Sequence, residues 1–104
     1  MTMRKGVYFL IEEASRFTGV KKSDIVAPNK LYENAYIRFA IMLVAKENLP
    51  ASLTAIARAL GRRDHTTTLH GARRAKELMD DPKSRVKEIV EHLLKALKDD
   101  HSGN

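Results

Sequence analysis

Residues 52–78, SLTAIARALGRRDHTTTLHGARRAKEL, contain the signals of two helices joined by a sharp turn. Ser52 can cap a first short helix, and Gly61 suits the left-handed position that ends it. Asp64 is a good cap for a second helix, which we expect to continue to Met79. A short helix, a glycine turn and a second capped helix are typical of a helix-turn-helix.

The second helix has two chemically different faces. At about 100° per residue, one arc collects small or apolar side chains together with the stem of Lys76. These residues are Leu69, Ala72, Ala75 and Met79. The opposite arc holds Thr66, His70, Arg73 and Arg74, with Thr67 at its edge. We expect the first arc to face the core and the second to face a ligand, because these polar side chains can contact phosphates and base edges.

The positive charge of the chain is concentrated in the same segment. Of the formal net charge of +6, residues 51–76 carry +5 and the other 78 residues carry +1. The charged residues of this stretch are Arg58, Arg62, Arg63, Arg73, Arg74 and Lys76 against Asp64. A localised basic surface attracts polyanions, most commonly nucleic-acid backbones. An acidic membrane surface is a weaker alternative, because the segment lacks the apolar face that an interfacial helix buries.

The rest of the chain also predicts helices, and no sustained two-residue alternation indicates a strand. We expect a helix at 7–18, a short turn at 23–26, a loop at 27–33, a long central helix ending near residue 48, and a last helix with Pro82 in its first turn. The predicted fold class is therefore all-α, a compact bundle of about five to six helices containing a helix-turn-helix with an extended turn. We expect one domain over residues 1–104, with its core at about 7–98 and a flexible tail at 99–104.

Composition excludes several classes of protein. The 104 residues include no cysteine, so disulfides and thiolate metal sites are unavailable. The start shows no export signal, and the longest apolar run is far short of the roughly 20 residues that cross a bilayer. These features predict a soluble, cytoplasmic protein, and we expect it to be a monomer.

The segment from Arg63 to His70 closely resembles domain IV of the bacterial replication initiator DnaA, in which Arg-Asp-His-Thr-Thr, an apolar residue, Leu and His form the recognition helix. The likeness extends more loosely from about Ile11 to Leu97. It implies a six-helix domain that binds double-stranded DNA at a short DnaA box.

The resemblance also implies roles for individual residues. Base contacts in the major groove fall to Asp64, His65 and Thr66. Phosphate contacts fall to Thr67, His70, Arg74, Arg38, Lys46 and the main-chain amide of Leu53. From the basic segment we add Arg62, Arg63 and Arg73 as phosphate contacts.

Three features depart from the family pattern. The arginine-rich loop that enters the minor groove is replaced here by APNKLYENAY, in which only Lys30 is available for such a contact. Arg62 replaces the usual second glycine, and Thr54 replaces an early proline. The sequence also lacks the glycine-rich phosphate loop of an ATPase, so we expect no nucleotide and no nucleotide-driven initiator activity from this chain alone.

Other chemistries fit the residues less well. His65 and His70 lie about 140° apart on a helix, which is poor spacing for a metal site. No nucleophile elbow, oxyanion loop or paired carboxylate points to an enzyme or a cofactor. The remaining alternative is a helical protein-interaction module, in which the last helix or the region of Tyr8, Phe9 and Phe17 contacts a partner protein and the basic surface is only solvated. The preferred prediction is sequence-selective binding of double-stranded DNA, in control of replication initiation or of transcription.

Overall fold

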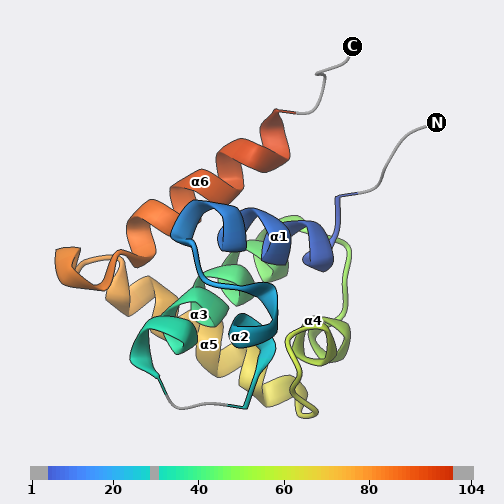
Figure 1. Ribbon diagram of the computed structural model, residues 1–104. Coiled ribbons are helices and arrows are strands. Elements are labelled where there is room, and N and C mark those ends of the chain that lie inside the picture. The colour runs from blue at the N-terminus through green and yellow to red at the C-terminus, as the bar shows by residue number, and fades with distance from the viewer. Residues whose placement is uncertain (1–4, 29–30, 100–104) are drawn as a thin grey trace.

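The computed structural model describes residues 5–28 and 31–99 of the chain. Its helices, shown in Figure 1, are α1 (Val7–Thr18), α2 (Lys22–Val26), α3 (Tyr32–Asn48), α4 (Leu53–Ala59), α5 (His65–Leu78) and α6 (Val86–Lys98), with a 3-10 turn, η1, at Pro82–Ser84. No strand occurs in these two described ranges, which confirms the all-α class.

Local sequence signals end and begin these helices as expected. Gly19 has a φ of 81° and donates its backbone N–H to the Ser15 carbonyl, which ends α1. Ser52 accepts a hydrogen bond from the Ala55 amide through its side chain and so caps α4. Gly61, with a φ of 77°, forms the turn after α4. These contacts confirm the predicted helix boundaries around the helix-turn-helix.

Two other boundaries differ from the predictions. The central helix starts at Tyr32, so the expected loop at 27–33 is shorter. The prediction that Pro82 lies in the first turn of the last helix is wrong, because Pro82–Ser84 form η1 and Arg85 adopts a left-handed φ of 63°. The Ser84 hydroxyl donates to the carbonyls of Leu78 and Asp81 at 2.7 and 2.8 Å. These bonds hold η1 as a separate turn, and α6 begins after it.

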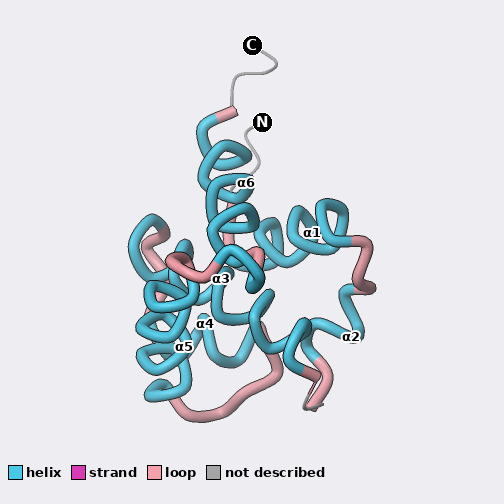
Figure 2. The backbone as a smooth tube through the Cα atoms, turned by 90° about the vertical axis from the view of Figure 1, so that its left-hand side faces the viewer, coloured by secondary structure: helices cyan, strands magenta, loops and turns pink. Residues whose placement is uncertain are grey.

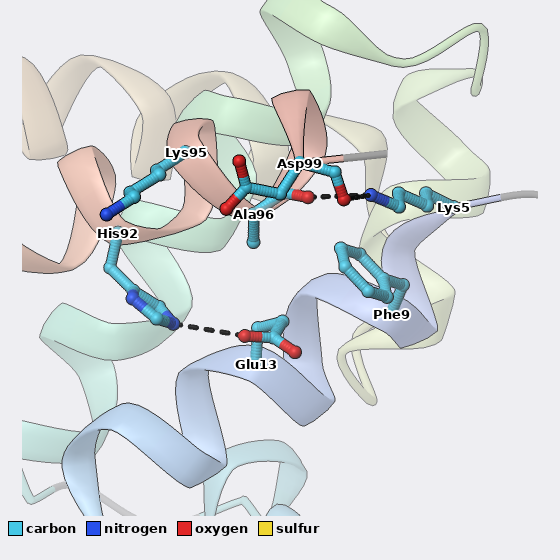
Figure 3. A pocket seen from close by; sticks show the side chains of 7 residues that line it. All are labelled: Lys5, Phe9, Glu13, His92, Lys95, Ala96 and Asp99. Atoms are coloured by element: carbon cyan, nitrogen blue, oxygen red, sulfur yellow. Dashed lines mark hydrogen bonds and ion pairs between the residues drawn. The ribbon is translucent and has the colours of Figure 1, made fainter. Parts of the chain in front are cut away.

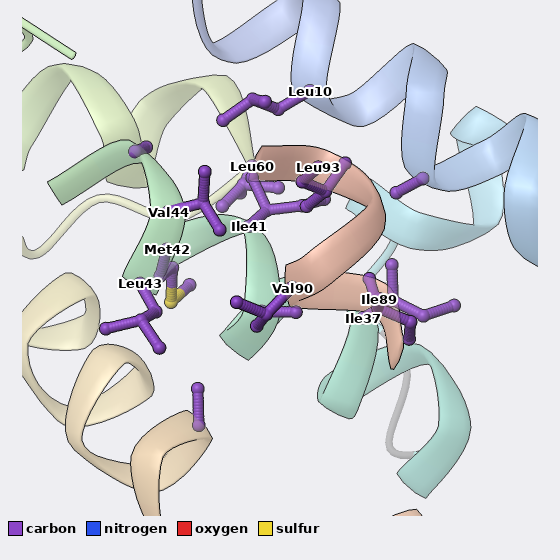
Figure 4. Packing of buried hydrophobic residues seen from close by; sticks show 14 of the residues in the cluster. Leu10, Ile37, Ile41, Met42, Leu43, Val44, Leu60, Ile89, Val90 and Leu93 are labelled. Carbon is purple, nitrogen blue, oxygen red and sulfur yellow. The ribbon is translucent and has the colours of Figure 1, made fainter. Parts of the chain in front are cut away.

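α3 runs through the middle of the molecule, between α1 and α6 on one side and α4 and α5 on the other (Figures 1 and 2). The centre of α3 is almost fully buried, and side chains from the other helices surround it (Figure 4). Its buried apolar residues are Ile37, Ala40, Ile41, Met42, Leu43, Val44 and Ala45. Burial of this apolar surface is the main favourable contribution to folding.

α6 packs its apolar stripe against α3 and α1. The buried residues of this stripe are Val86, Ile89, Val90 and Leu93. The apolar face of the last helix therefore covers the core of its own chain. In the part of the chain that the structure describes, no helix has the length and apolar character needed to span a membrane.

Candidate nucleic-acid interface

The first turn of α5 is organised by Asp64. Its carboxylate accepts a hydrogen bond from the Thr66 amide at 2.9 Å, and His65 Nδ1 lies 3.5 Å from the same oxygen. The backbone hydrogen bond from Thr66 is the main cause that lowers the pKa of the Asp64 carboxyl, because it stabilises the charged form. The side chains of Asp64 and His65 are 63% and 57% exposed, so both remain accessible to a ligand while they shape the helix start.

The exposed face of α5 is rotated relative to the sequence prediction. His65, His70 and Arg73 are exposed as expected, and Thr66 is half-buried. Leu69 was expected in the core but is 36% exposed. The residues that α5 does bury are Thr68, Gly71, Ala72, Ala75 and Leu78. The predicted face was therefore shifted around the helix axis, and an apolar side chain lies among the polar ones.

Thr68 and Gly71 explain this orientation. The Thr68 hydroxyl, fully buried, donates to the Leu53 carbonyl at 2.9 Å and so joins the start of α4 to α5. A Cβ at Gly71 would collide with Met42 Sδ and lie 3.2 Å from the Phe39 ring, so glycine lets α5 approach α3 closely. Sequence reasoning missed both residues. The spacing 68, 71, 72 and 75 was the signal that could have found them.

Arg38 and Arg62, both predicted to contact phosphate, point inward in the structure. Arg38 is 5% exposed and donates from Nη1 to the Ile25 carbonyl at 2.8 Å. Burial, together with the nearby charge of Arg62, lowers the pKa of Arg38 to about 10. Arg62 donates from Nη1 to the carbonyls of Val26 and Leu60 at 3.0 and 2.9 Å, and from Nη2 to Ala27 at 3.2 Å. Burial also lowers the pKa of Arg62.

The other predicted phosphate contacts lie at or near the surface. Lys46, near the end of α3, is exposed, as is Arg63 in the turn before α5. Arg74 is exposed and lies 3.1 Å from Glu77 in a surface ion pair, which contributes little to stability and can be exchanged for another anion. Leu53, at the first position of α4, and Thr67 are half-buried. Lys30, the predicted minor-groove contact, lies outside the described residues.

The helix-turn-helix of this structure matches a known family in sequence. A family model described as the bacterial DnaA protein helix-turn-helix matches residues 8–75, from α1 to the last turn of α5. The chain belongs to this family. No solved structure matches the chain.

Several chromosomal replication initiator proteins DnaA are similar to the chain. The protein of Cereibacter sphaeroides is 43% identical over 60 residues, which cover 58% of the chain and 13% of the initiator. The protein of Ruegeria pomeroyi is 37% identical over 86 residues, or 82% of the chain and 18% of the initiator. That of Bartonella quintana is 36% identical over 83 residues, or 80% and 16% respectively. The chain thus spans less than a fifth of the length of these relatives.

α4 and α5 form the helix-turn-helix of this DnaA family, and hydrogen bonds close the turn between them. The turn closes with the Gly61 amide donating to the Arg58 carbonyl at 3.0 Å and the Arg62 amide to the Ala57 carbonyl at 2.8 Å. Asp64 then starts α5 only two residues later. In Figure 1 the start of α5 lies beside α4, at the lower edge of the molecule.

An open pocket of about 430 Å³ lies between α1 and α6 (Figure 3), and α3 separates these two helices from α5 (Figure 1). Its polar groups contact one another: His92 Nε2 lies 3.1 Å from Glu13 Oε1, and Lys5 Nζ donates to the carbonyls of Ala96 and Asp99. Tyr8, in α1, is 74% exposed. Across residues 5–28 and 31–99, no group of three or more His, Cys, Asp or Glu side chains could hold a metal ion.

Proposed function

We propose that the chain binds double-stranded DNA in a sequence-selective manner by placing the first turn of α5 in the major groove. The membership in the DnaA helix-turn-helix family supports this function, as does the position of α5 at the surface. The similarity to chromosomal replication initiator proteins DnaA favours a DnaA-box-like site as the target.

One observation carries the proposal. The exposed side of α5 carries histidine, arginine and threonine side chains, which are of the kinds that can contact bases and phosphates, while the opposite side is buried on α3 and α4. His65 and Thr66 lie in the first turn, which enters deepest into the groove in a helix-turn-helix complex. Arg73 and Arg74 lie two turns later, where the flanking backbone is within reach.

The proposed contacts divide by chemistry. The base contacts are Asp64, His65 and Thr66. The phosphate contacts are Lys46, the Leu53 amide, Arg63, Thr67, His70, Arg73 and Arg74. We leave Arg38 and Arg62 out of the proposed contact set, because both donate hydrogen bonds to main-chain carbonyls. A minor-groove contact by Lys30 stays a prediction.

The proposed role is control of replication initiation or of transcription through occupation of such sites. DNA binding of this kind needs neither a bound nucleotide nor a catalytic step. We further propose that the chain acts as a monomer in the cytoplasm, where chromosomal DNA is accessible to it.

The salt dependence of binding tests the phosphate contacts. Fluorescence anisotropy measures the affinity for a duplex with a DnaA-box-like site and for a scrambled duplex, over a series of salt concentrations. We expect Arg74→Ala to weaken binding to both duplexes by a similar factor and to make the slope of log affinity against log salt about one unit shallower. Lys95→Ala is the matched control, because it removes the same charge from an exposed site beside the α1–α6 pocket.

An unchanged slope in Arg74→Ala would contradict the proposed orientation of α5. Equal effects of Arg74→Ala and Lys95→Ala would show that only net charge matters. Absence of binding to any duplex would favour the alternative of a protein-interaction module, for which the exposed Tyr8 and the α1–α6 pocket supply a surface.

A further inference from the structure

The turn of the helix-turn-helix is seated on the end of α2, a helix far from it in sequence. The Cβ of any residue other than glycine at position 61 would lie 2.5 Å from the Val26 carbonyl oxygen. The next residue, Arg62, extends along the same surface and donates hydrogen bonds to the carbonyls of Val26 and Ala27. A backbone contact and a side-chain contact therefore join the same two segments.

The Arg62 guanidinium also binds the Leu60 carbonyl, which follows the last residue of α4. One side chain thus connects the C-terminal carbonyls of two helices, α4 and α2, and we call these three hydrogen bonds the Arg62 bridge. Helix C-termini leave carbonyls without a partner in the helix and carry partial negative charge, so a forked cation suits this position. Arg38 adds a fourth bond from α3 to the Ile25 carbonyl.

The next residue along the chain provides a contrast within the same turn. Arg63 is exposed, whereas Arg62 is half-buried and engaged by main-chain carbonyls. Asp64, the cap of α5, follows directly. The residues that are held on the end of α2 therefore lie directly before the start of α5.

We propose that Arg62 is a positioning residue for DNA recognition, which holds the turn on the end of α2 and so sets the direction of the first turn of α5. It acts through Asp64, His65 and Thr66 and does not contact the DNA backbone. The inference rests on the proposed function, since it assigns Arg62 a part in base selection by that same site.

The experiment compares Arg62→Ala with Arg63→Ala, two identical changes at adjacent positions. Affinities for the matched and the scrambled duplex are measured over a salt series. In Arg62→Ala we expect the ratio of the two affinities to fall by about tenfold, the loss of one well-formed base contact, with an unchanged salt slope. In Arg63→Ala we expect both affinities to fall together and the slope to become shallower by about one unit.

Hydrogen exchange of the free protein reports on the bridge without DNA. We expect the amides of α2 (Lys22–Val26) to exchange faster in Arg62→Ala than in Arg63→Ala, because only the first loses the bonds to Val26 and Ala27. If Arg62→Ala does not fold, Arg62→Lys replaces it, since this variant keeps the charge and loses the forked donor. Its affinity ratio should then lie below the wild-type ratio at an unchanged slope.

A shallower slope in Arg62→Ala with an unchanged affinity ratio would overturn the proposal, because it would make Arg62 a phosphate contact. An unchanged ratio, slope and exchange rate would overturn it as well. If the wild-type chain binds both duplexes equally or not at all, the proposed function itself fails. If the wild-type chain binds selectively and Arg62→Ala keeps the same affinity ratio, the proposed function stands and only the positioning role of Arg62 fails.

Discussion

At the scale of single residues, Asp64 combines helix capping with a proposed base contact. Its Oδ1 accepts the Thr66 amide, and this hydrogen bond lowers the pKa of the Asp64 carboxyl below its ordinary value. A carboxyl with a lowered folded-state pKa stabilises the protein above its unfolded-state pKa, and this stabilisation is lost as the pH falls through the folded-state value. The cap therefore makes α5 sensitive to acid.

Asp64→Asn tests this sensitivity. Asparagine keeps a side-chain oxygen that can accept the Thr66 amide, but it has no proton to gain. In thermal melts between pH 7 and about pH 3, we expect the wild-type Tm to fall more than the Tm of Asp64→Asn, with the difference appearing below the ordinary aspartate pKa of about 4. Parallel curves over the whole range would show that the carboxylate adds nothing to the cap.

At the scale of elements, the turn between α4 and α5 depends on glycine for two separate reasons. Gly61 has a left-handed φ of 77°, and it lies against the Val26 carbonyl. Gly19, at the end of α1, has a similar φ of 81°, but a Cβ there would meet nothing within 4 Å. A substitution at Gly19 therefore reports backbone strain alone, whereas one at Gly61 reports the same strain plus a steric contact with Val26.

We expect Gly19→Ala to lower the free energy of unfolding by about 1–2 kcal/mol, the ordinary cost of the left-handed conformation for alanine. Gly61→Ala should cost clearly more, because the Val26 carbonyl is main chain and must move away from the Arg62 bridge. Urea denaturation of both variants measures the difference. Equal losses would indicate that the turn can shift without disturbing α2.

The elements differ in how far the sequence could predict them. Local signals sufficed for α1, α4 and the cap of α5, because Gly19, Ser52 and Asp64 act on their own neighbours. The start of α6 was missed because Ser84 bonds back to the carbonyls of Leu78 and Asp81 and Arg85 adopts a left-handed conformation, neither of which the position of Pro82 indicates. Thr68 was not expected in the core, since its burial depends on a carbonyl supplied by another helix.

In the candidate site, too, the features set by local sequence could be predicted, and those set by distant residues could not. The exposure of His70, Arg73 and Arg74 followed from helical periodicity, whereas that of His65 was expected only from the family resemblance. The inward direction of Arg38 and Arg62 could not be predicted, because the carbonyls that they bind come from residues 25–27, which lie far away in sequence. Cations that a charge pattern assigns to a surface can instead serve the ends of neighbouring helices.

At the scale of the whole molecule, the part of the chain that the structure describes has two distinct surfaces. α5 and the end of α3 carry the proposed DNA contacts, and the α1–α6 side carries the pocket around Glu13 and His92 (Figures 1 and 3). The apolar stripe of α6 is buried inside the molecule. We therefore propose the α5 side as the DNA-binding surface, because exposed histidine and arginine side chains lie there on a helix of the DnaA helix-turn-helix motif.

Selection of bound sequences from a random pool of duplexes tests the central claim most directly. We expect the wild-type chain to enrich one short motif, and Thr66→Ala and His65→Ala each to relax the preference at particular base pairs, by about 1–3 kcal/mol of discrimination per lost contact. Lys95→Ala, far from α5, should enrich the wild-type motif. Enrichment of no motif by the wild-type chain, or of an identical motif by all four proteins, would contradict recognition through the first turn of α5.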